Sequence, residues 1–391
     1  MIPQAELLNR IMKLQDTMQK DNIAAALLVQ RADLFYFSGT GQNAHLFIPA
    51  EGEPILVVKK SVTRAQQESE LENLIPFKGW DELYKLIAES ISSGAQIGLE
   101  TDVLPANLYF RYQKLLSNYS LVDISNKIRK IRAVKSAHEI RLMREAAKIS
   151  NSVFNHAGEI IQLGMTEVEL AGQLESHARS KGHQGAVRMR GFNQELFYGH
   201  IMAGDNSAAI SFFDGPTGGS GLNPSFPQGA GAAPIQRNQP ILVDFVSILG
   251  GYMVDQTRIF CLGNPPMHLL ESHRSAVRIK HTLAEMGKPG ILCSSLFDKA
   301  EKMAKEAGLA NHFMGYTEKV SFVGHGLGLE LDELPVIARG LDIPLEEGMV
   351  FALEPKFIFP GEGTVGIEDT FMVGCNRLDQ LTSFNEDIQL L

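Results

Sequence analysis

The chain has 391 residues, a formal net charge of -9 and three cysteines. This length suggests two domains, and the acidic charge excludes a basic surface for nucleic acid or for an anionic membrane. Cys261, Cys293 and Cys375 lie far apart, which argues against a disulfide framework or a thiolate zinc site and fits a reducing compartment. No apolar run approaches the roughly 20 residues of a membrane span, and the first residues do not resemble a signal peptide. We therefore expect a soluble cytoplasmic protein.

Residues 1–130 alternate short apolar runs with helical patterns, which predicts an α/β domain built on a mixed sheet. His45 is the only histidine in this part, and its place beside a glycine-containing loop favours a solvated side chain. No cluster of histidine, cysteine and carboxylate residues suggests a site here. We expect helices at residues 5–20, 81–89 and 106–116, and strands at residues 23–29, 34–37, 45–48, 54–58 and 96–100.

A basic stretch at residues 126–135, NKIRKIRAVK, leaves little room for a core and is interpreted as the connection between two domains, residues 1–130 and 131–391. A capping-box pattern follows at Ser136 and Glu139, and a second one at Thr166 and Glu169. The second domain is therefore expected to begin with two helices.

Residues 241–258 contain two apolar runs separated by Gly250 and Gly251, which predicts two strands joined by a tight turn. Each run holds one aspartate, Asp244 or Asp255. Burying an unpaired carboxylate is costly, so two of them on neighbouring strands suggest a shared cation. The alternative is that each aspartate is hydrogen-bonded or pairs with a basic side chain such as Arg258.

Three later segments of strand character supply further ligand-type residues: His325, Glu354 and Glu368. Taken singly, the histidine is explained by a hydrogen bond in the core, and each glutamate by a strand end or by pairing with Arg258 or Lys356. Taken together with the two aspartates, they offer four carboxylates and one imidazole. Such a set suits manganese, iron, cobalt or zinc, and two divalent ions would neutralise its four charges.

Residues 215–234 are rich in glycine and proline and predict a loop, either flexible at the surface or ordered around a pocket. The loop lacks the GK[ST] ending of a phosphate-binding P-loop. The glycines around His325 lack the strand-then-helix setting of a dinucleotide fingerprint and instead favour close approach of the backbone to a ligand. Neither feature predicts a nucleotide cofactor.

The motifs LVDF, VDQTR, GHGLGLE, LEP and IEDT place Asp, Asp, His, Glu and Glu in a fixed order. Their order and spacing resemble the pita-bread metallopeptidase family of methionine aminopeptidase, prolidase and creatinase. The segments KIRKIRAVKSAHEIRLMREAA and EEGMVFALEP resemble its Xaa-Pro peptidase and creatinase branch, so the resemblance covers nearly the whole chain. It implies an α/β protein with a creatinase-type N-terminal domain and a C-terminal pita-bread catalytic domain.

The resemblance also implies a centre of two divalent metal ions, with manganese as the first expectation. In it, Asp244 chelates one ion, Asp255 and Glu368 bridge both, and His325 and Glu354 hold the second. Family members are commonly homodimers, so a homodimer acting on a short peptide or another small molecule is expected.

Three positions depart from the peptidases of the family. Asp332 replaces the histidine that follows the ligand histidine by seven residues, Ser211 replaces another histidine, and Gly366 replaces the arginine of GxRIEDT. An aspartate beside cations stays ionised, so Asp332 is a candidate base and a poor proton donor. His200 is a candidate replacement for a missing histidine, or a structural residue. The arginines and aromatic residues of segment 188–198 are candidates for binding a substrate carboxylate, or are solvated.

The expected activity is removal of an N-terminal residue from short peptides, as in Xaa-Pro aminopeptidases and dipeptidases, through water activated by metal. One alternative is a non-peptidase member with Asp332 as base, comparable to dimethylsulfoniopropionate lyase or to a creatinase-like hydrolase. A further alternative is a binding protein that has lost catalysis, against which the retention of all five ligand-type residues argues.

Overall fold

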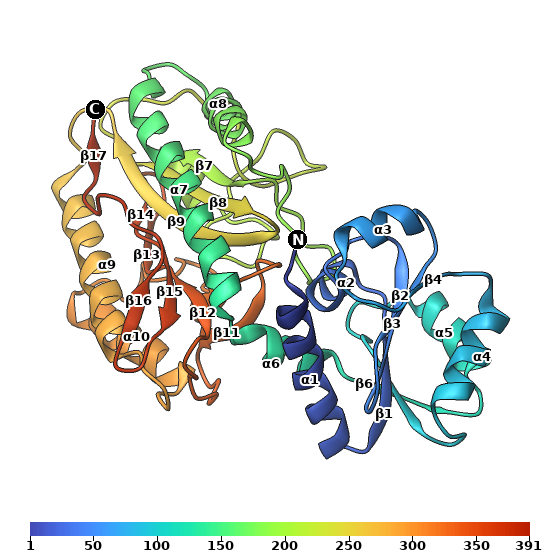
Figure 1. Ribbon diagram of the computed structural model, residues 1–391. Helices are drawn as coiled ribbons and strands as arrows, with labels where there is room; N and C mark the ends of the chain where they lie inside the picture. Colours follow the sequence, from blue (N-terminus) through green and yellow to red (C-terminus); the bar gives the residue numbers. More distant parts are fainter. The chain divides into compact units, whose positions relative to one another are not determined.

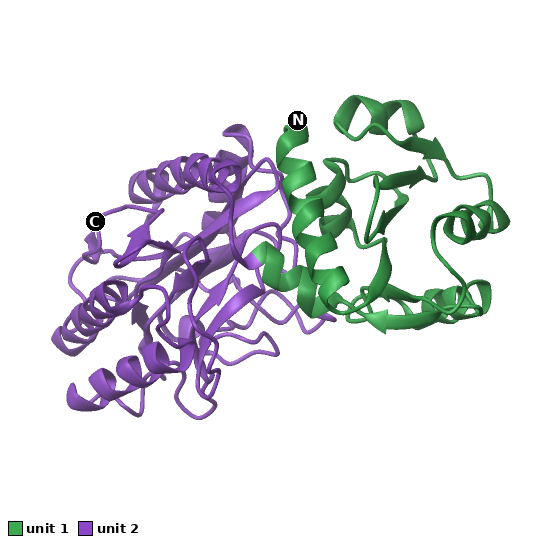
Figure 2. Cartoon of the chain, turned by 60° about the horizontal axis from the view of Figure 1, so that its bottom comes forward, with its two compact units in different colours: residues 1–132 green, residues 133–391 purple.

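The computed structural model describes residues 1–391, which form two compact units, Met1–Arg132 and Ala133–Leu391 (Figure 2). The division lies within two residues of the boundary predicted after residue 130. The basic stretch NKIRKIRAVK is not a simple connection, because most of it forms helix α6 (Ser125–Ala133). Ile128 is completely buried, and Arg132 pairs with the buried Asp33 at 2.6 Å, so this stretch contributes to the core of the first unit.

The first unit is built on one mixed sheet in the strand order β4-β3-β2-β1-β5-β6, as predicted. Strand β1 pairs antiparallel with β2 and parallel with β5. No helix of the chain combines the length and apolar character that a bilayer crossing requires. The elements of this unit are α1 (Gln4–Lys20), β1 (Ile23–Leu28), α2 (Arg31–Ser38), β2 (Ala44–Pro49), β3 (Ile55–Val58), α3 (Val62–Glu68), β4 (Leu74–Pro76), α4 (Trp80–Ser90), β5 (Gln96–Leu99), α5 (Ala106–Leu115), β6 (Ser120–Asp123) and α6.

Two expectations for the first unit were wrong. Residues 34–37 form part of helix α2, because the Gln30 side chain caps its first turn and Gly39, at a φ of 78°, ends it. His45 lies inside strand β2 and is completely buried, and its Nε2 atom is 2.8 Å from the hydroxyl of Tyr112. Its ring also packs against Phe77 and Trp80. His45 is therefore a core residue of an aromatic cluster.

The second unit has strands between helices α7 and α8 on one side and α9 and α10 on the other (Figure 1). Its sheets have the strand orders β17-β9-β8-β7, β11-β10-β12-β15-β16 and β13-β14. The elements are α7 (Ala137–Ile160), α8 (Glu167–Ser180), β7 (Gly199–Ala203), the 3₁₀ turn η1 (Gly204–Ala208), β8 (Ile241–Leu249), β9 (Tyr252–Cys261), α9 (Met267–Met286), α10 (Cys293–Glu306), β10 (Phe322–Gly326), β11 (Glu333–Ala338), β12 (Val350–Leu353), β13 (Lys356–Phe359), β14 (Gly363–Gly366), β15 (Asp369–Val373), β16 (Leu378–Gln380) and β17 (Gln389–Leu390).

The signals that predicted the start of this unit are confirmed. Helices α7 and α8 begin with complete capping boxes at Ser136 and Thr166. Strands β8 and β9 pair antiparallel throughout their length. Gly250 and Gly251, at φ values of 59° and 89°, form the tight turn between them, in the backbone region where glycine carries no steric penalty. This hairpin is the scaffold that carries both aspartates.

Candidate metal centre

The five predicted ligand residues converge where the sheet of β8 and β9 meets the sheet of β10, β12 and β15. An isolated antiparallel bridge between Thr257 and Glu368 joins the two sheets at this point. Their side chains come from five places on the chain: Asp244 on β8, Asp255 on β9, His325 on β10, Glu354 directly after β12, and Glu368 directly before β15.

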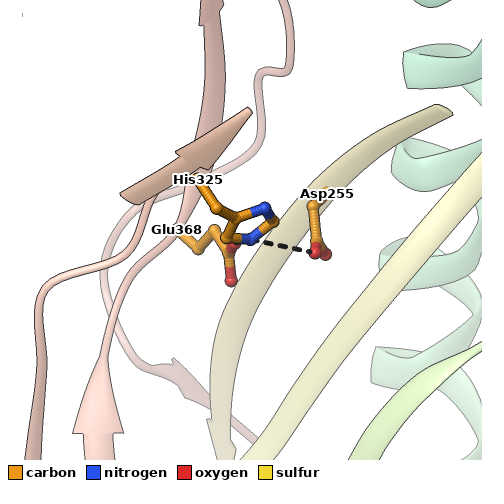
Figure 3. A group of neighbouring side chains, drawn as sticks. All are labelled: Asp255, His325 and Glu368. Carbon is orange, nitrogen blue, oxygen red and sulfur yellow. Dashed lines mark ion pairs between the residues drawn. The ribbon is translucent and has the colours of Figure 1, made fainter. Parts of the chain in front are cut away.

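The Nε2 atom of His325 faces three carboxylates. It lies 3.9 Å from an oxygen of Asp255, 3.9 Å from an oxygen of Glu354 and 3.7 Å from an oxygen of Glu368. Figure 3 shows His325 between Asp255 and Glu368, whose ligand atoms all lie within 4.8 Å of one another. Two atoms bound to one zinc-like ion at about 2.0–2.2 Å are at most roughly 4.4 Å apart, so each of the three distances from His325 is short enough for an ion to bridge that pair.

The surroundings of these residues also fit a metal. The Nδ1 atom of His325 is 2.8 Å from the carbonyl oxygen of Leu331, which only accepts, so Nδ1 carries a proton and Nε2 is the ring nitrogen that faces the carboxylates. The hydroxyl of Thr257 donates to Oε2 of Glu368 at 2.8 Å. Oε1 of the same carboxylate is buried without a hydrogen-bond partner. Because buried polar atoms are normally satisfied, this oxygen is available to bind a cation.

The electrostatics of the pocket favour added positive charge. Burial and the neighbouring charges of Glu368 and Asp244 raise the pKa of Asp255 well above its ordinary value. Burial favours the neutral form of His325, but Glu368, Glu354 and Asp255 together raise its pKa to about 10. Both shifts arise because four carboxylates share a small buried volume, and a bound divalent cation would relieve the same repulsion.

Lys356 is the member of this cluster that the sequence did not predict to lie among the ligands. Its ammonium lies 3.0 Å from Oδ2 of Asp244, 2.9 Å from Oε2 of Glu354 and 2.9 Å from Oε2 of Glu368. Although burial acts to lower it, these carboxylates hold the pKa of Lys356 well above its ordinary value. Pairing of the glutamates with Lys356 was one of the two interpretations considered for them, and the structure contains that pairing.

Arg258 does not take the other pairing role considered for it. Its guanidinium lies 2.9 Å from Oδ1 of Asp369 and donates to the main-chain oxygens of Thr257 and Glu368. Lys280 of α9 reaches the second oxygen of Asp369 at 2.5 Å. All three charged side chains are completely buried, so Arg258 holds strands β9 and β15 together behind the metal ligands.

Comparison with known proteins agrees with this geometry. Residues 141–374 match the metallopeptidase family M24, and residues 10–134 match the creatinase/prolidase N-terminal domain. The chain belongs to metallopeptidase family M24.

Relatives of this M24 chain match it from end to end. It is 25% identical over 97% of its length to an Xaa-Pro dipeptidase of Pyrococcus furiosus and 27% identical over 97% to one of Pyrococcus horikoshii, covering 99% and 98% of those proteins. The crystal structure of the Pyrococcus horikoshii prolidase has 25% identity and a TM-score of 0.80, covering 96% of this chain and 99% of that one. The structure of an Xaa-Pro dipeptidase from Bacillus anthracis, at 23% identity and a TM-score of 0.84, matches the fold over 98% of this chain and 100% of that one. These matches establish the creatinase N-terminal domain and the pita-bread catalytic domain.

Asp332 holds a neighbouring loop in this M24 chain. Its two carboxylate oxygens accept hydrogen bonds from the backbone N–H groups of Arg190 and Gly191, at 2.7 and 2.6 Å. The N–H of Leu331 also donates to the carbonyl oxygen of Arg188, and Arg190 lies 3.5 Å from Glu330. Both oxygens of Asp332, the predicted base, thus accept from backbone N–H groups. The Arg190 guanidinium, a candidate for binding a substrate carboxylate, pairs with Glu330 instead.

The hydroxyl of Ser211 donates to the carbonyl oxygen of Pro227, within the glycine- and proline-rich loop at residues 215–234. This loop is tightly packed on the segment that carries Ser211, because a side chain at Gly218 would meet the Cβ of Ser211 at 2.4 Å. Ser211 therefore fixes the path of this loop, and its role in shaping a pocket stays a prediction.

His200 of β7 lies directly opposite Asp244 in the antiparallel ladder, and such opposite residues share one face of the sheet. It is 5% exposed, and its Nε2 atom is buried without a hydrogen-bond partner. Burial lowers the pKa of His200, while the nearby charge of Asp244 acts in the opposite direction. His200 is therefore the predicted catalytic residue with a buried ring nitrogen, Nε2, that has no hydrogen-bond partner.

Proposed function

We propose that this chain is a metal-dependent hydrolase that removes the N-terminal residue from short peptides of the Xaa-Pro type. The observation that carries the proposal is the convergence of His325 with Asp255, Glu354 and Glu368 at distances that one ion can bridge. The end-to-end similarity to Xaa-Pro dipeptidases supports a peptide substrate.

A metal ion bound here would activate water and polarise the scissile carbonyl. The residues of the chain prepare the site for that chemistry. Leu331 fixes the His325 ring, Thr257 fixes the Glu368 carboxylate, and the uncommitted Nε2 of His200 is our candidate for handling the proton of the leaving amine. Manganese is our first choice of metal, and a homodimer stays a prediction.

Aromatic side chains support a substrate with an apolar ring. Phe213 packs edge-on against His200, with ring centroids 5.1 Å apart. Phe197 and Phe226 stack on each other at 4.9 Å, and Phe197 is largely exposed. Because a proline ring is apolar and rigid, these rings are suitable for packing against it.

The test combines metal analysis with a panel of substrates. The purified protein, loaded with Mn²⁺, is assayed with Ala-Pro, longer Xaa-Pro peptides, dimethylsulfoniopropionate and creatine. We expect turnover of Xaa-Pro peptides that a chelator or His325→Ala abolishes, while Asp298→Ala, at an exposed position on α10, leaves it unchanged.

A different result would identify the alternative activity. If a non-peptide substrate is turned over, and Asp332→Ala stops this while the metal content stays the same, the chain is a non-peptidase member of its family with Asp332 as base. A metal-loaded protein without turnover of any of these compounds would contradict the proposal as well.

A further inference from the structure

Lys356 fills the space between three of the carboxylates that a two-ion centre would use. Its three N–H groups account for Oδ2 of Asp244, Oε2 of Glu354 and Oε2 of Glu368, all within 3.0 Å. An ammonium group has three donors and no acceptor, so its bonding capacity is used completely by these oxygens. Lys356 itself is 1% exposed. A metal ion bound by the same three oxygens would have to displace the ammonium.

The contacts of Gly366 show how closely the chain packs around Lys356. It is the direct partner of Lys356 in the β13–β14 ladder. A Cβ atom added at Gly366 would lie 2.6 Å from the carbonyl oxygen of Pro355, 2.7 Å from Cα of Lys356 and 2.8 Å from Cγ of Lys356, closer than real contacts allow. A side chain at position 366 would therefore require both the backbone at Pro355 and Lys356 and the Lys356 side chain to shift.

The ligand atoms that Lys356 leaves available face one position. Oδ1 of Asp255 accepts a hydrogen bond from the backbone N–H of Gln256, so Oδ2 is the oxygen that faces His325. Glu354 and Glu368 likewise turn their Oε1 atoms to His325. The ligand atoms of Asp255, His325 and Glu368 all lie within 4.8 Å of one another, and Oε1 of Glu354 lies 3.9 Å from Nε2 of His325.

The charges agree with this count. With the imidazole neutral, as a metal ligand must be, four carboxylates and one ammonium carry a net charge of -3, which a single divalent ion reduces to -1. A second divalent ion would give a buried centre of +1 in which the ammonium faces two metal cations, an arrangement opposed by their mutual repulsion.

We propose that Lys356 serves as a built-in cation in place of one metal ion, so that this M24 centre binds a single divalent ion through Asp255, His325 and Glu368, with Glu354 beside it. The inference depends on the proposed function only in taking the site to bind metal. It revises the two-ion centre that the family resemblance implies.

The experiment measures how many Mn²⁺ ions each chain holds. Full-length protein is stripped with a chelator, loaded with excess Mn²⁺, desalted and analysed by mass spectrometry for metal, alongside its electron paramagnetic resonance spectrum. We expect one ion per chain and the spectrum of isolated Mn²⁺. Two ions per chain with the spectrum of an exchange-coupled pair, or no retained ion, would overturn the proposal.

Two substitutions test whether Lys356 is what excludes a second metal ion. Lys356→Gly opens the space and removes the charge, and we expect its Mn²⁺ content to double, with an exchange-coupled spectrum. Lys356→Met removes the charge but keeps the bulk, so its content should not exceed that of the native chain. A Lys356→Gly variant that folds, as judged by circular dichroism, and still binds one ion would show that Lys356 does not exclude the second.

Metal content and peptide turnover separate this inference from the proposed function. A native chain with two ions that cleaves Xaa-Pro peptides refutes only the single-ion centre. A native chain with one ion that cleaves none of them refutes only the proposed activity.

Discussion

Glu368 divides its two oxygens between different partners. Oε1 faces His325, and Oε2 accepts from Lys356 and Thr257. Although burial acts in the other direction, Lys356 and His325 lower the pKa of Glu368 to about 2, so it stays ionised at neutral pH. One side chain thus joins the fixed ammonium to the metal position.

Glu368→Gln is expected to remove metal-dependent stabilisation. The native protein should gain about 2.7 kcal/mol of unfolding free energy when free Mn²⁺ is a hundredfold above its dissociation constant, and the variant should gain none at that concentration. Thermal unfolding with and without Mn²⁺ measures this. Glu362→Gln, which changes an exposed glutamate paired with His268, is the matched control and should keep the full gain. A variant that retains it would show that Glu368 is not a ligand.

His45 makes the first unit sensitive to acid. Burial, with a smaller effect of the charge of Lys59, lowers the pKa of His45 from 6.5 to about 3. The unfolded chain therefore binds a proton below pH 6.5 that the folded unit does not. The stabilisation is complete above pH 6.5 and falls by about 1.4 kcal/mol per pH unit as the pH drops towards 3.

The measurement compares the native chain with His45→Gln between pH 7 and pH 5. The same comparison cancels the opposite contribution of the buried Glu100, whose pKa is raised by burial and by Asp33. Urea unfolding followed by the emission of Trp80, the single tryptophan, should show the native chain losing about 2 kcal/mol more than the variant. Equal losses would show that His45 is protonated in the folded unit.

Single residues differ in how well their positions could be predicted. The order and spacing of the five ligand-type residues were sufficient to predict their convergence. Lys356 was considered only as an alternative partner of the glutamates, and its contact with Asp244, 112 residues away, depends on tertiary packing. His45 was misplaced for a similar reason, since its burial in strand β2 depends on Tyr112 of α5 and Trp80 of α4.

At the scale of elements, sequence signals predicted helix starts and turns correctly where they depend on specific neighbouring side chains. The two capping boxes and the paired glycines of the β8–β9 turn depend on neighbouring residues alone. Residues 34–37 and 126–135 were assigned from apolar content and charge, which do not distinguish a short helix from a strand or a connection. Their helices depend on caps and on burial of Ile128 and Arg132 in the core.

The capping box of α8 is expected to make a measurable contribution to the free energy of unfolding. In the structure, the Thr166 side chain accepts from the N–H of Glu169, and the Glu169 carboxylate accepts from the N–H of Thr166. Thr166→Ala should lower the free energy of unfolding by about 1 kcal/mol, because both bonds of the helix start are weakened. Chemical denaturation measures the loss. Thr282→Ala, in the interior of α9, is the control and should change stability by less than about 0.5 kcal/mol.

At the scale of the whole molecule, each unit has a hydrophobic core of its own. The family resemblance was enough to predict both domains. It did not predict the buried network behind the ligands, since Arg258, Lys280 and Asp369 come from β9, α9 and β15 and meet only in the folded unit.

Because the two units have separate cores, we expect metal binding to change the thermal unfolding of one unit and not of the other. Trp80 belongs to the first unit, and the metal ligands belong to the second. We therefore expect Mn²⁺ to raise the temperature of a calorimetric transition while the transition of Trp80 emission stays where it is. If Mn²⁺ shifts both signals equally, the two units unfold as one.

The network of Arg258, Asp369 and Lys280 has a consequence for which ions the centre accepts. Because it fastens β9 to β15 from behind, the Asp255 and Glu368 side chains have little freedom to move apart. Ca²⁺ needs six to eight oxygen ligands at about 2.3–2.6 Å, which a tight cradle with an imidazole donor does not provide. Ca²⁺ should therefore leave the melting temperature unchanged at concentrations where Mn²⁺ or Zn²⁺ raises it. The fixed spacing of β9 and β15 would then select the bound ion by its size.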